Sequence, residues 1–134
     1  MLMPAAVLVM VILAAIGADL SHVHMARAGL ADLAQTIAND VAAGALDTRA
    51  LRNTGRYVLD PCMAMNIAEG HVNDQSTRTL QNIVIHPITV SDDGEYRVTV
   101  SLNAEVEHIF GKGIPRAGDA MPLHATSTAT LRDQ

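Results

Sequence analysis

The N-terminal stretch of this sequence is apolar throughout, and this restricts what the chain can fold into more than any other feature. Met1 to Ala18 (MLMPAAVLVMVILAAIGA) carry no charged side chain, and Asp19 is the first charged residue. A helix rises about 1.5 Å per residue, so this stretch would be about 27 Å long, close to the thickness of a hydrocarbon core. A helix that is apolar on every face needs lipid or a larger protein around it.

Three interpretations of this stretch follow. The first is a single transmembrane helix, which its length and lack of charge favour. The second is a cleaved secretion signal, because Ala15-Ile16-Gly17 and Ile16-Gly17-Ala18 offer small residues to a peptidase, although no basic residue precedes the apolar run. The third is the core helix of a soluble protein, for which a chain of 134 residues is small.

The transmembrane interpretation predicts which side chains contact lipid or neighbouring helices. Small residues among them would let helices approach closely. The predicted membrane and helix-packing residues are Pro4, Val7, Val11, Ala14 and Gly17.

The residues after this stretch continue the same helix. Asp19 to Leu46 contain no proline and are rich in Ala and Leu, which favour helix. Pro4 falls in the first turn, where a helix tolerates proline, and Gly44 falls where helices end. We therefore predict one rod from Ala5 to Leu46, about 60 Å long. A stripe of apolar residues at three- and four-residue steps predicts the face that packs on the rest of the chain. This stripe consists of Leu30, Leu33, Ile37 and Val41.

Two short helices are predicted after the rod. Asp47 can cap a helix over Thr48–Asn53. Asp60-Pro61 is a second start signal, since it places a capping residue before a proline at the first helical position. We expect this helix to cover Cys62–Glu69 and to end near Gly70, followed by a polar loop.

The next segments have the composition and alternation of strands. Leu80–Val90 is rich in β-branched residues, although Pro87 predicts an edge strand or a bulge. Ser91–Gly94 predicts a turn, which makes a hairpin with the following strand. Glu95–His108 alternates apolar and polar residues throughout its length, which predicts one buried and one solvated face.

A Gly/Pro-rich connection over Gly111–Pro122 precedes a last strand over Leu123–Leu131. The prediction is an α+β fold, with a long N-terminal helix, short helices and a three-stranded antiparallel sheet packed on the helix stripe. We divide the chain into a transmembrane anchor (1–18), an extension of the same helix (19–46) and a small extracytoplasmic domain (47–134).

The charged residues argue against several functions. With 14 acidic and 9 basic side chains the chain has a net charge of -5, which disfavours nucleic acid as a partner. Cys62 is the only cysteine, so no internal disulfide forms, and we expect it to be a small buried hydrophobe.

The six histidines do not form a metal-ligand pattern in the sequence. His22 and His24 would lie about 200° apart around a helix axis and could not chelate one ion. His71, His86 and His124 are isolated in the sequence. We therefore expect no catalytic, cofactor-binding or metal-binding residues.

Three stretches in this order resemble a known family. They are Met3-Pro4-Ala5 to Gly17 running into Leu30–Ala45, Val58-Leu59-Asp60-Pro61 with Ala64 and Ala68, and Tyr96–Val100 followed by Leu123–Leu131. The chain is similar to the TadE/TadG-like minor pilins, or pseudopilins, of tight-adherence (Flp-type) pili, especially short actinobacterial members. That family also has a basic leader, a cleavage site and a glutamate before the anchor proline. Only Met1–Met3 stand there in this sequence, so these features are not carried over.

The resemblance implies a pilin-like fold and a non-enzymatic role in pilus assembly. It implies a single-pass protein of the cytoplasmic membrane, with its C-terminal domain outside the cell. The implied partners are other pilus or secretion-system subunits, in homo- or hetero-oligomers formed through the N-terminal helix. The alternative is a secreted or membrane-tethered surface binding module whose apolar start is a cleaved signal.

Overall fold

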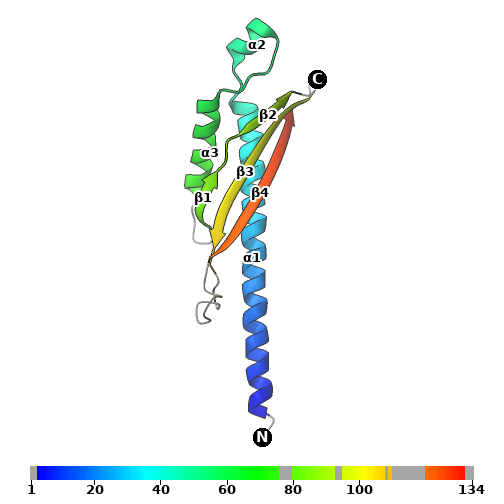
Figure 1. Cartoon of the computed structure of the whole chain (residues 1–134), viewed down its shortest axis with the longest axis vertical. Helices are drawn as coiled ribbons and strands as arrows, with labels where there is room; N and C mark the ends of the chain where they lie inside the picture. The colour runs from blue at the N-terminus through cyan, green and yellow to red at the C-terminus, as the bar shows by residue number, and fades with distance from the viewer. Residues whose placement is uncertain (1–2, 76–79, 93–94, 108, 110–119, 132–134) are drawn as a thin grey trace.

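A single long helix is the axis of the molecule. The computed structural model describes residues 3–75, 80–92, 95–107, 109 and 120–131. Helix α1 (Met3–Gly44) is 42 residues long and unbroken, which confirms the predicted long N-terminal helix (Figure 1). At about 1.5 Å per residue it measures about 63 Å. The rest of the fold lies along its C-terminal half, and its N-terminal half projects beyond the sheet (Figure 1).

The two short helices begin at the capping residues that the sequence indicates. The Asp47 side chain accepts hydrogen bonds from the backbone N–H groups of Arg49 and Ala50, at 2.9 and 3.1 Å, and so caps α2 (Thr48–Thr54). Gly55 ends α2 with a φ of 67°, a left-handed conformation that glycine adopts without strain. The Asp60 side chain caps α3 (Pro61–Gln75) in the same way.

Helix α3 is longer than predicted. It continues through Gly70 to Gln75, so the predicted end near Gly70 and the loop from Asn73 are wrong; the rest of that loop, 76–79, lies outside the described residues. Glycine costs a helix only about 1 kcal/mol relative to alanine. Two contacts beyond Gly70 accompany the continuation: His71 bonds to Asp40 of α1 at 2.7 Å, and Val72 packs on the core. Tertiary contacts therefore override the local stop signal.

Within the described residues the sheet has four strands, because one predicted strand is divided. Strands β1 (Gln81–Ile85) and β2 (Thr89–Asp92) lie along the same edge of β3 (Tyr96–Val106), with His86–Ile88 between them. Proline has no N–H to donate, so Pro87 interrupts the ladder, as predicted for an edge strand. A register irregularity and a φ of 50° at Asn82 distort β1 further. The described sheet therefore has one strand more than the three that were predicted.

The other edge of β3 pairs over its whole length with β4 (Met121–Leu131). All strand pairs are antiparallel, and the α+β fold is confirmed. Strand β3 alternates without a fault between buried and more exposed residues, as its sequence predicts. The predicted turn at Ser91–Gly94 is wrong in its first half, because Ser91 and Asp92 belong to β2, and its second half lies outside the described residues. Strand β4 begins two residues before the predicted Leu123, and residues 111–119 of the predicted connection lie outside the described residues.

The core lies between the sheet and the two longer helices. Leu30, Leu33, Ile37 and Val41 of α1 are each at most 2% exposed, and they form one cluster with the inner face of β3 and β4. Alanines fill the rest of the helix surface in this core, so that the backbones can lie close together. They are Ala26, Ala34, Ala38 and Ala42 on α1, Ala45 directly after α1, and Ala64 and Ala68 on α3.

We expect Ile37→Ala to lower the free energy of unfolding by about 3 kcal/mol, because it removes buried methylene groups and leaves a cavity in the core. Urea unfolding of the full chain in detergent micelles measures the effect. Gly29→Ala is the control, since a Cβ at Gly29 would meet nothing within 4 Å. It should raise stability by up to about 1 kcal/mol through helix propensity. Equal free energies of unfolding for Ile37→Ala and Gly29→Ala would contradict the packing of Ile37 in the core.

Candidate membrane-binding helix

The N-terminal half of α1 exposes apolar side chains around its whole circumference. An 18-residue window of this helix has a mean hydropathy of 2.1, and none of that window is buried. The large apolar residues that are more than half exposed here are Val7, Leu8, Val9, Met10, Val11, Ile12, Leu13 and Ile16. The helix is long and apolar enough to cross a membrane, and its place near the N-terminus also fits a signal segment.

The structure leaves the five predicted membrane and helix-packing residues free of the folded domain. Pro4, Val7, Val11, Ala14 and Gly17 are all exposed. A Cβ at Gly17 would meet nothing within 4 Å, so packing within this chain does not require glycine there. Any close approach that these small residues allow would be to another molecule.

Helix α1 changes within two turns from its exposed N-terminal half, the bare half, to the half that packs on the domain. Leu20 is 66% exposed, whereas Ala26 is 3% exposed. One residue before Leu20, Asp19 Oδ1 accepts a hydrogen bond of 3.0 Å from the backbone N–H of Ile109, which belongs to the segment after β3. The first charged residue of the chain therefore lies where the sheet domain begins to cover the helix.

Two histidines that are far apart in the sequence meet on the outer face of the sheet. Asn103, on β3, lies between His86 and His124, at 2.7 Å from His86 Nε2 and 2.6 Å from His124 Nδ1. Thr126 and Ser101 extend this chain of hydrogen bonds, at 3.0 and 3.1 Å. The expectation that His86 and His124 are isolated is therefore wrong. Only the strand register, which cannot be read from composition, brings them to one asparagine.

This polar network already uses the ring nitrogens that point to its centre. Asn103 presents one amide donor and one carbonyl acceptor, so one of the two facing ring nitrogens accepts a hydrogen bond and the other donates one. Among the described residues, no three His, Cys, Asp or Glu side chains lie together as a metal site requires. The network therefore joins β3, β4 and the segment between β1 and β2 through polar side chains.

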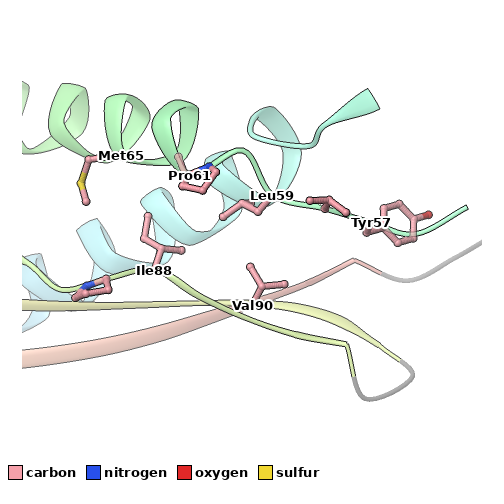
Figure 2. Close-up of a pocket in the computed structure, with 9 residues that line it drawn as sticks. Tyr57, Leu59, Pro61, Met65, Ile88 and Val90 are labelled. Atoms are coloured by element: carbon pink, nitrogen blue, oxygen red, sulfur yellow. The ribbon is translucent and has the colours of Figure 1, made fainter. Parts of the chain in front are cut away.

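A groove of about 490 Å³ lies at the far end of the domain, between the start of α3 and strand β2 (Figure 2). Its described lining is apolar except for the Tyr57 hydroxyl. The lining residues are Tyr57, Val58, Leu59, Pro61, Ala64, Met65, Pro87, Ile88 and Val90. Such a lining offers apolar contact and supplies neither a carboxylate nor an imidazole. Sequence reasoning did not identify this groove, because the broken edge strand that forms one wall is a tertiary feature.

Tyr96 is the one large aromatic residue in the described core. It is 3% exposed, its ring lies 5.3 Å from that of Tyr57, and its hydroxyl has no hydrogen-bond partner among the described residues. Burial raises the pKa of the Tyr96 phenol above its ordinary value of 10.0, because the phenolate would lose its hydration. The phenol is thus held in its neutral form by the core.

Cys62 is exposed, so the expectation of a buried cysteine is wrong. Ala64 and Ala68 of α3 turn toward the core, at 1% and 0% exposure. Cys62 stands about 200° around the helix from Ala64 and therefore faces solvent. The chain carries its single thiol at the far end of the domain from the bare helix.

Comparison with models of known families, with characterised proteins and with solved structures finds no match to this chain. The family resemblance therefore stays a prediction from the sequence.

We expect Tyr96→Phe to leave the free energy of unfolding at neutral pH unchanged or to raise it by about 1 kcal/mol, since it removes a buried hydroxyl without a partner. Because the pKa of Tyr96 is raised in the folded state, the free energy of unfolding also depends on pH. The stability due to the neutral phenol is complete below the unfolded-state pKa and is lost as pH rises through the folded-state pKa. Unfolding midpoints measured between about pH 9 and 11 should fall more steeply in the natural chain than in the variant. Identical slopes would contradict burial of the phenol.

Proposed function

We propose that this chain is a single-pass protein of the cytoplasmic membrane that acts as a non-enzymatic, minor-pilin-like component of a pilus or secretion assembly. One observation carries the proposal: a single helix is apolar and bare over one half and packed into a folded domain over the other. The bare half needs an apolar surrounding, which lipid and neighbouring helices supply.

The continuity of α1 supports an assembly role. The membrane half and the domain half belong to one unbroken helix of 42 residues, so the domain cannot move as a separate body on a flexible linker. Helix contacts made in the bilayer would therefore fix the position of the domain as well. The Ala14 and Gly17 side of the bare half offers a surface for such contacts.

The resemblance to TadE/TadG-like minor pilins supports the pilus context and the placement of the domain outside the cell. The net charge of -5 agrees with helix packing rather than electrostatic attraction to anionic lipid or nucleic acid as the basis of binding.

The second candidate function is a secreted or tethered surface binding module. The apolar groove favours it, because a pocket of about 490 Å³ is large enough for a small ligand. Under this alternative the apolar start is a signal, which is removed on secretion. Release of the domain into the medium without its first eighteen residues would favour it over the membrane proposal.

We expect Val11→Asp to release the chain from the membrane fraction, because a carboxylate at the centre of a membrane helix costs about 2.5–3.5 kcal/mol on insertion. Alkaline-carbonate extraction of membranes followed by immunoblotting measures the retained fraction. Ala31→Asp is the matched control, since Ala31 is also exposed on α1 but lies beside the domain. In the source organism, the natural chain and the control should restore surface filaments to a deletion strain, whereas Val11→Asp should not. Full retention of Val11→Asp would overturn the anchoring.

The exposed thiol of Cys62 tests which side of the membrane holds the domain. With the domain outside the cell, a membrane-impermeant maleimide should label intact cells as fully as lysed cells. Cys62→Ser provides the background signal. Labelling only after lysis would place the domain inside the cell and contradict the proposed topology.

A further inference from the structure

We propose that the end of the sheet nearest the bare helix rests in the head-group layer of the bilayer, so that the domain contacts the membrane at a second place besides α1. Its described apolar side chains include Ile109, after β3, and Met121, the first residue of β4. The inference rests on the proposed anchoring and deepens it, because it specifies how the domain stands on the membrane.

The height of this end follows from one hydrogen bond. Asp19 is the first charged residue of the chain, so the boundary of the hydrocarbon lies near it. The polar head-group layer adds about 5–7 Å on each side of a hydrocarbon core of about 30 Å. Ile109 donates its backbone N–H to Asp19 Oδ1 at 3.0 Å, so its backbone lies at the same level of the helix as this boundary.

The side chains at this end suit a layer that is partly apolar. Ile109 is 52% exposed and Met121 is 37% exposed. Met121 pairs with Val106, the last residue of β3, and Ile109 follows three residues later. Ile109 and Met121 therefore belong to the same end of the domain. Leu20, one residue after Asp19, is 66% exposed. Insertion of these side chains would remove apolar surface from water.

The charged residues at this end indicate what kind of membrane surface it fits. Among the described residues at this end, Asp19 and Glu107 are acidic, and the basic Arg27 lies farther along α1. Attraction to anionic lipid requires clustered Lys or Arg, and the described residues at this end provide no such cluster. The described side chains therefore offer an apolar contact, for which a zwitterionic bilayer is sufficient.

The opposite end of the domain is far from this layer. Asp60 donates its backbone N–H to the carbonyl of Ala45, which places the start of α3 beside the end of α1. Ala45 lies about 39 Å beyond Asp19 along a helix that rises about 1.5 Å per residue. Cys62 and the apolar groove therefore stand in water on the side away from the membrane, which makes Cys62 a built-in reference position.

The experiment uses the full chain reconstituted in phosphatidylcholine vesicles. Ile109→Cys and Met121→Cys are each made together with Cys62→Ser, and an environment-sensitive fluorophore is attached to the single thiol. The natural chain labelled at Cys62 is the control. We expect blue-shifted emission and strong quenching by head-group nitroxide lipids at 109 and 121, and neither effect at 62.

A third labelled variant, Val11→Cys with Cys62→Ser, separates this inference from the anchoring. Deep quenching at 11 together with water-like emission at 109 and 121 would overturn the second membrane contact while the anchor stands. Water-like emission at 11 would overturn the anchoring, and the further inference with it.

Discussion

The packing of one helix stripe on one sheet face is the interaction on which the rest of this structure depends. Leu30, Leu33, Ile37 and Val41 lie on the inner face of β3 and β4, and without them the sheet would expose its apolar side to water. The domain is small and has few aromatic residues, so it cannot build a core from the sheet alone. Helix α1 is therefore part of the domain and not a tether attached to it.

This packing requires α1 to satisfy two different surroundings along one axis. Its C-terminal half is amphipathic, with Asp32 and Asn39 exposed on the side away from the core. Its N-terminal half is apolar on every side and has no face that the domain could cover. No proline or kink separates the two halves, so the orientation of the domain is fixed once the bare half is fixed. In a membrane, the sheet would then stand at a constant height and angle.

Sequence reasoning recovered the features that are encoded locally. The long helix, the Asp47 and Asp60 caps and the alternation of β3 depend on neighbouring residues, and the structure contains all of them. Sequence reasoning failed where contacts between residues far apart in the sequence determine the structure. Helix α3 runs past Gly70 where His71 reaches Asp40, and His86 meets His124 because both flank the same strand. The apolar groove and the exposure of Cys62 depend on how α3 is turned against α1, which no periodicity in the sequence specifies.

The two ends of the domain differ in a way that follows from the direction of α1. The end beside Asp19 has isolated exposed apolar side chains and a hydrogen bond that ties it to the helix. The far end has a concave apolar groove beside a broken edge strand. Isolated apolar side chains can be buried by a fluid lipid layer, which adapts to any shape. A concave groove needs a partner of matching shape, and under the proposed anchoring lipid would lie about 39 Å away from it along the helix. A chain held at one end by its membrane would thus keep its shape-selective surface for whatever approaches from outside.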